Sequence, residues 1–134
     1  MSKDASKQSL KLKEVDLILD EMKELGKFKG IVLSYRNGGL IAQNVDNNSD
    51  LNEFAAMSAS VLESAEGLRD CFGAKRLERI IAEIGNYSII ITECNSEIFI
   101  TFIIENESRL ESRLDRVFNN LLEFFQKIIN ACES

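Results

Sequence analysis

The chain has 134 residues, which is enough for one hydrophobic core and too few for two independent ones. Hydrophobic residues make up 45% of it and charged residues 28%, a balance typical of a folded domain and too apolar for a disordered chain. The net charge of −6 gives phosphate backbones no general attraction, so nucleic acid is not expected as a partner.

The residue types needed for most enzyme chemistry are scarce. Histidine is absent, which removes the commonest general base and the commonest metal ligand. Cys71, Cys94 and Cys132 are far apart and form no C-x-x-C pair, so they indicate neither a disulfide framework nor a zinc site and fit the reducing cytoplasm. The acidic stretch 46–50 lacks the glycine and the terminal glutamate of a calcium loop. The sequence predicts no catalytic residue, no metal and no cofactor.

The first predicted element is an amphipathic helix over residues 10–25, in which apolar residues recur at helical spacing until Gly26. Residues 1–11 lack an apolar signal core, and no apolar run approaches the roughly 20 residues that span a bilayer. Membrane insertion is therefore not expected.

Two strands follow, over residues 28–35 and 40–45. Between them lies Arg36-Asn37-Gly38-Gly39, where asparagine and glycine tolerate the positive φ that a tight hairpin requires. The glycine pair does not indicate a phosphate loop, because the Lys-Ser/Thr of a Walker motif is missing. The segment 28–45 is predicted to be a β-hairpin.

A long second helix is predicted from residue 51 to about Phe72, with Asp50 as its N-cap and Gly73 at its end. Three strands joined by turn-forming pairs come next, as a meander over residues 77–84, 87–94 and 97–104. A last helix runs from Arg109 to about Asn130. We place the domain at residues 10–130, between a flexible N-terminal segment (1–9) and a C-terminal tail (131–134).

The second helix has an apolar face about 160° wide, more than the roughly 100° stripe that one core requires. At 100° per residue its centre holds Phe54, Val61, Ala65 and Phe72, and this row is predicted to lie on the sheet. If the first and last helices share one sheet face, the second is alone on the other, with an uncovered margin. A second copy of the chain would cover that margin by two-fold symmetry, although its alanines could equally serve only as helix formers. The margin predicted as a dimer interface comprises Leu51, Ala55, Ser58, Ala59 and Leu62.

The strand over residues 77–84 has the pattern of an edge strand, because Arg79 and Glu83 alternate with apolar residues. If two copies pair antiparallel about Ile81, Arg79 of one lies opposite Glu83 of the other, and the opposite charges favour that register. Arg79, Ile81 and Glu83 are therefore added to the predicted dimer interface.

Three stretches resemble the Roadblock/dynein-light-chain family. GIVLSYRNGGLIA at 30–42 is similar to the family's opening hairpin, and the AAMSA run within 51–72 is similar to its alanine-rich central helix. RLERIIAE at 76–83, followed by YSIII at 87–91, is similar to its edge strand and buried sheet. The resemblance implies an α/β (α+β) fold with one five-stranded antiparallel sheet, two helices on one face and one on the other. It also implies dimerisation through the central helix and the third strand.

Family members act as dynein subunits, as scaffolds for Ras-like GTPases and, in the MglB-like branch that this layout resembles, as activators of GTP hydrolysis. The resemblance thus implies a non-enzymatic dimer, with itself or with another Roadblock subunit, that binds a small Ras-like GTPase. The candidates for GTPase contact are Glu66, Arg69, Lys75 and Arg76. Two alternatives stay open: a structural adaptor of a motor or membrane-associated complex without GTPase contact, and a small-molecule sensor with a cavity inside the sheet.

Overall fold

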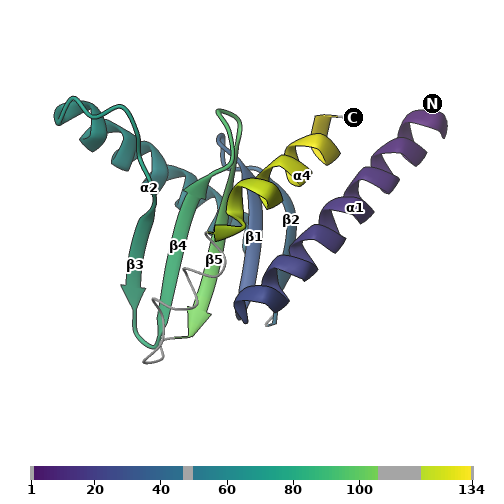
Figure 1. Ribbon diagram of the computed structural model, residues 1–134, viewed down its shortest axis with the longest axis horizontal. Helices are drawn as coiled ribbons and strands as arrows, with labels where there is room; N and C mark the ends of the chain where they lie inside the picture. The colour runs from purple at the N-terminus through teal and green to yellow at the C-terminus, as the bar shows by residue number, and fades with distance from the viewer. Residues whose placement is uncertain (1, 47–49, 106–118, 134) are drawn as a thin grey trace.

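The computed structural model describes residues 2–46, 50–105 and 119–133, which form three helices and a five-stranded sheet (Figure 1). The elements in chain order are α1 (Ser2–Gly26), β1 (Gly30–Tyr35), β2 (Leu40–Val45), α2 (Leu51–Cys71), β3 (Ile80–Ile84), β4 (Tyr87–Glu93), β5 (Ile98–Glu105) and α4 (Leu121–Glu133). Neighbouring strands are antiparallel in the order β2-β1-β5-β4-β3. The predicted fold class and the edge position of β3 are confirmed.

The helices cover the two faces of the sheet unequally. α1 and α4 lie on one face and contact each other, and α2 is the only described helix on the other, as predicted (Figure 1). Beneath α1 and α4 is a large core that includes Leu19, Met22 and Phe102. Beneath α2 is a smaller cluster of Ala59, Leu62, Ile91 and Phe99. Because each large apolar side chain contributes about 1.5–3 kcal/mol when buried, the α1–α4 face supplies most of the stabilisation.

Three boundaries differ by three residues or more from those predicted. α1 begins at Ser2 rather than at residue 10, because its first turns are polar helix-forming residues without the apolar spacing that marks a helix in a sequence. β3 begins at Ile80 rather than at residue 77. The predicted start of the last helix, Arg109, lies outside the described residues, and the helix ends at Glu133 rather than Asn130.

The predicted turn and caps are confirmed. Gly38 adopts a φ of +98° in the β1–β2 turn, and the Gly38 N–H donates to the carbonyl of Tyr35 over 2.9 Å. The Asp50 side chain accepts a hydrogen bond from the N–H of Asn52 at the start of α2, as an N-cap does. Gly73, just past the C-cap, adopts a φ of +64°.

The row of α2 predicted to face the sheet is wrong. Val61 and Phe72 of that row are 45% and 86% exposed. The buried positions are instead the small and leucine residues assigned to the dimer margin, namely Leu51, Ala55, Ser58, Ala59 and Leu62. The cause is a close approach: a Cβ on Gly38 would lie only 3.2 Å from the Cα of Ala56. Only small side chains fit where α2 crosses the hairpin turn, so the larger apolar residues point outward.

Candidate interaction surface

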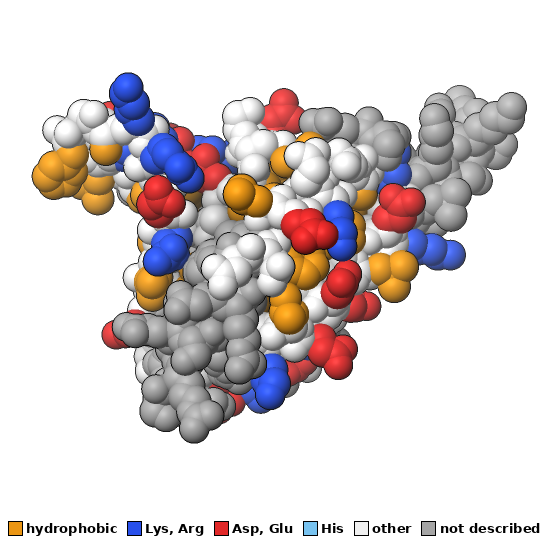
Figure 2. Space-filling view, viewed as in Figure 1, with side chains coloured by type: hydrophobic (Ala, Val, Ile, Leu, Met, Phe, Trp, Pro, Cys, Tyr) orange, Lys and Arg blue, Asp and Glu red, His pale blue; other side chains and the backbone are white. Residues whose placement is uncertain are grey.

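The outer side of α2 and the neighbouring sheet edge carry a group of exposed hydrophobic side chains. We call this group the α2–β3 surface; it consists of Met57, Val61, Leu68, Phe72, Ile81, Ile84 and Tyr87, all between 41% and 86% exposed. Of these, Ile81 is opposite Ile90 of the α1–α4 core and so lies on the other face of the sheet edge. The C-terminal end of α2 projects beyond β3 (Figure 1). Figure 2 shows hydrophobic side chains at this projecting end, with basic ones beside them. Apolar surface of this kind typically marks an interaction site.

An apolar groove of about 340 Å³ opens on the same face of the sheet as α2. Of the lining residues that the structure describes, seven of nine are apolar; they are Lys29, Val45, Asp46, Leu51, Phe54, Ile84, Tyr87, Ile89 and Ile103. Ile84 ends β3 and Tyr87 begins β4, on either side of the turn between them, and Leu51 and Phe54 belong to the first turn of α2. The chain comes from α2 into β3 at Ile80, whereas the groove lies at the other end of this strand, beside Ile84.

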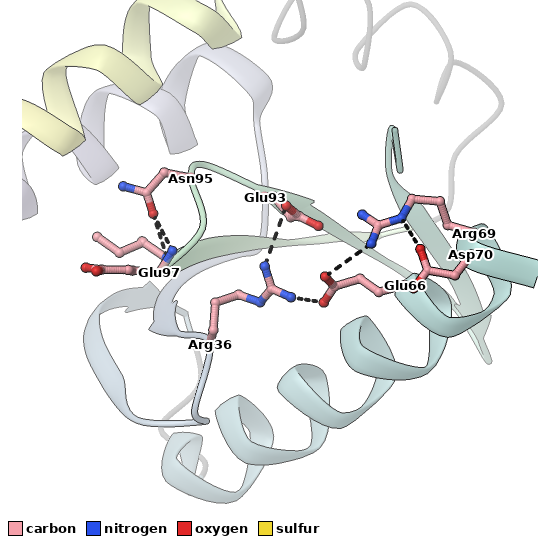
Figure 3. Close-up of polar contacts among 8 residues, drawn as sticks. Arg36, Glu66, Arg69, Asp70, Glu93, Asn95 and Glu97 are labelled. Atoms are coloured by element: carbon pink, nitrogen blue, oxygen red, sulfur yellow. Dashed lines mark hydrogen bonds and ion pairs between the residues drawn. The ribbon is translucent and has the colours of Figure 1, made fainter. Parts of the chain in front are cut away.

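An ion-pair network holds the second half of α2 against the sheet (Figure 3). The guanidinium of Arg36, in the β1–β2 turn, pairs with Glu66 of α2 and lies 3.6 Å from a carboxylate oxygen of Glu93 at the end of β4. Arg69 lies 3.8 Å from Glu66 and 3.2 Å from Asp70. Glu66 and Arg69, two of the predicted GTPase contacts, are thus engaged within the chain.

Lys75 and Arg76, the other two predicted GTPase contacts, lie outside this ion-pair network. Lys75 and Arg76 are exposed in the segment between α2 and β3, where Arg76 lies 3.6 Å from Glu78 in an open ion pair. In the predicted dimer edge, Arg79, Ile81 and Glu83 are all exposed, with Ile81 at 46%. Sequence reasoning thus identified the edge strand, while the five α2 residues it assigned to the interface lie inside the single chain.

Two features of this surface had no signal in the sequence. In the sequence, Arg36 is recognisable only as part of a turn. No sequence motif links it to Glu66 or Glu93, which lie 30 or more positions away. The groove is lined by five separate parts of the chain, so no motif could indicate it.

At the other end of the sheet, polar contacts join α1 to β2. The ammonium of Lys23 donates to the side-chain oxygen of Asn44 over 3.1 Å and pairs with Asp46, and Asn44 donates to Asp20. The hydrogen bond from Lys23 holds the pKa of Asp46 below its ordinary value of 3.8, so this carboxylate stays charged. These contacts form a mixed-charge rim that fixes α1 to the sheet edge.

Residues 2–46, 50–105 and 119–133 offer few side chains suited to metal binding or catalysis. No group of three His, Cys, Asp or Glu side chains is placed to hold a metal ion there. Burial raises the pKa of the Cys94 thiol, and the nearby Cys132 raises it further, so the thiolate needed for nucleophilic attack is scarce. None of the described helices is long and apolar enough to cross a bilayer.

The sequence and the fold were compared with those of known proteins. No curated protein matches the sequence. Myxococcus xanthus MglB has a similar structure with a TM-score of 0.69 at 21% identity, covering 84% of this chain and 94% of that one. The gliding protein MglB from Thermus thermophilus gives 0.70 at 12%, covering 87% and 92%. An MglB with a tetrameric arrangement gives 0.70 at 13%, covering 88% and 92%. The Roadblock/LC7 domain model matches residues 14–103, most of the chain, and the chain therefore belongs to the Roadblock/LC7 domain family.

Proposed function

We propose that this chain is a dimeric, cytoplasmic Roadblock-type regulator that binds a small Ras-like GTPase and modulates its GTP hydrolysis. The observation that carries the proposal is the α2–β3 surface, which leaves large apolar side chains such as Phe72 and Leu68 uncovered on a chain of this family. Exposed apolar side chains gathered in this way commonly mark protein interaction sites.

The first partner in this proposal is a second copy of the chain. β3 is an edge of the sheet whose residues Ile81 and Ile84 are 46% and 58% exposed. An edge strand with apolar side chains invites pairing with another strand. The tetrameric arrangement named for one structurally similar MglB supports assembly through a surface of this fold.

The second partner is the GTPase, and its binding site is proposed on the surface built by the paired α2 helices. Lys75 and Arg76 are exposed next to the projecting end of α2, where cations complement an acidic protein surface. Glu66 and Arg69 are proposed to support this site by holding the helix end in place through Arg36. The regulator contributes no nucleophile of its own; it acts by binding.

The test is co-purification with Ras-like GTPases from the source cell, followed by single-turnover GTP hydrolysis with and without the protein. Lys75→Glu should weaken binding several-fold, because charges at the rim of an interface mainly affect association. Lys13→Glu, on the exposed side of α1, makes the same charge change away from the surface and should leave binding intact. Binding without acceleration would limit the role to a scaffold, and the absence of any bound GTPase would favour the adaptor alternative and reject the proposal.

A further inference from the structure

We infer that the apolar groove of one copy receives the C-terminal end of α2 from a second copy, with Phe72 as the inserted side chain. This inference rests on the proposed dimer and names what fills the groove. It also assigns an occupant to Phe72, which ends α2 with 86% of its surface exposed and has no cover within the described chain.

The positions of the two features on the sheet lead to this pairing. Phe72 and the groove lie on the same face of the sheet, since α2 itself lines the groove through Leu51 and Phe54. They lie at opposite ends of β3: the chain passes from Phe72 into Ile80, whereas the groove borders Ile84. A single chain therefore cannot fill its own groove with its own helix end.

Antiparallel pairing of β3 with its copy reverses these ends. The two-fold axis between two antiparallel edge strands is perpendicular to the sheet, so both α2 helices stay on one face while the start of one β3 meets the end of the other. The end of α2 already projects beyond β3, in the direction of the added sheet (Figure 1). It is thus carried over the partner's β3–β4 turn, where the groove opens.

The chemistry of the two surfaces is complementary. An aromatic ring and the neighbouring Leu68, which is 62% exposed, would meet a lining whose described residues are apolar at seven of nine positions. Buried aromatic side chains dominate interfaces because each removes a large apolar area from water. The contact is isologous, so each dimer has two inserted rings and two filled grooves.

Site-specific cross-linking tests the contact directly. Phe72→Cys and Tyr87→Cys are made in separate chains that also carry Cys71→Ser. The two chains are co-expressed and then oxidised at a concentration above the dissociation constant of Phe72→Ala, so that loss of the ring does not itself prevent pairing. We expect a disulfide-linked dimer that neither variant gives alone. Co-expression of Leu122→Cys with Tyr87→Cys is the control, since Leu122 is 84% exposed on α4, on the other face of the sheet. A dimer by sedimentation that gives no disulfide between positions 72 and 87, or equal linkage in the control, would overturn the inference.

A second measurement does not depend on thiols. Phe72→Ala should weaken self-association by roughly ten- to a hundredfold, as loss of a central aromatic anchor does, while the exposed position leaves the fold of each chain intact. Leu122→Ala is the matched control. An unchanged dissociation constant in Phe72→Ala would reject the inserted ring. Loss of GTPase binding with the cross-link retained would reject the GTPase proposal alone, so the two failures are distinguishable.

Discussion

Gly38 is the residue that decides which side of α2 faces the sheet. A helical wheel ranks positions by hydrophobicity and so places the largest apolar residues inward. The contact at Ala56 leaves no room for them, because even a Cβ on Gly38 would lie 3.2 Å from the helix backbone. The small residues Ala55 and Ala59 therefore pack inward, and the large ones remain exposed on the outer side.

Replacement of Gly38 by alanine should destabilise the chain by about 1–3 kcal/mol, because its φ of +98° disfavours a side chain and the new Cβ crowds Ala56. Urea denaturation measures the change. Gly67→Ala is the matched control: it lies in α2 with nothing within 4 Å of a new Cβ, and should stabilise by about 0.5–1 kcal/mol. Equal stability of the two variants would contradict this role of Gly38.

Asp46 gives a pH-dependent prediction at the same scale. Since Lys23 lowers the pKa of Asp46 in the folded chain, the stability from this pair is present above the ordinary pKa of 3.8 and is lost as the pH falls through the lower folded value. A carboxyl-carbon NMR titration should place the midpoint of Asp46 below 3.8, and Lys23→Met should move it upward. A midpoint that does not respond to Lys23→Met would rule out the lysine as the cause.

At the scale of elements, α2 is held by two different kinds of contact. Its first half packs on the hairpin turn through small residues, and Leu62 packs on Ile91 and Phe99 of the sheet. Its last turns are held by the charges of Arg36, Glu66 and Glu93. The three charged side chains are each about a quarter exposed, so their attraction is stronger than in an open surface pair. The position of the C-terminal end of α2 should therefore depend more on salt concentration than the position of its N-terminal half.

Arg36→Met should destabilise the chain by about 1 kcal/mol, because it removes the cation beside Glu93 and leaves Glu66 with only the more distant Arg69. The difference from the parent chain should shrink in 1 M salt, where the Debye length is about 3 Å. Arg76→Met is the control, since its pair with Glu78 is 79% and 67% exposed and should change stability by less than about 0.5 kcal/mol. A loss of stability that is equally large at high salt would point to packing rather than charge.

Much of the fold was predictable from the sequence because its signals are local. The strands follow apolar runs bounded by turn residues, and Asp50 and Gly73 mark the ends of α2. The inward row of α2 was not predictable, because it depends on the distance between Ala56 and a turn residue, Gly38, that lies well before it in the chain. The Arg36 network and the groove depend in the same way on distant segments that only the folded sheet brings together.

At the scale of the whole molecule, the two faces of the sheet are covered to different extents. The α1–α4 face buries a large core, whereas the α2 face buries a small cluster and leaves an open groove beside it. This asymmetry matches a chain that completes its second face by assembly.

The edge charges give the prediction at this scale. In a dimer paired about Ile81, Arg79→Glu or Glu83→Arg places like charges opposite each other at two symmetric positions, and each single variant should weaken association several-fold. The double variant restores opposite charges and should regain the parent affinity. Analytical ultracentrifugation of the four chains measures this cycle; unchanged association in either single variant would exclude the register.

The close fit of Gly38 against Ala56 has a consequence for how such a chain can diversify. Because the inward side of α2 is committed to the hairpin turn, its outward side, with Met57, Val61 and Leu68, contributes little to the folding of the single chain. Substitutions there can retarget the helix to new partners while the scaffold keeps its shape. In the proposed dimer, partner binding and folding of the single chain therefore depend on opposite sides of the same helix.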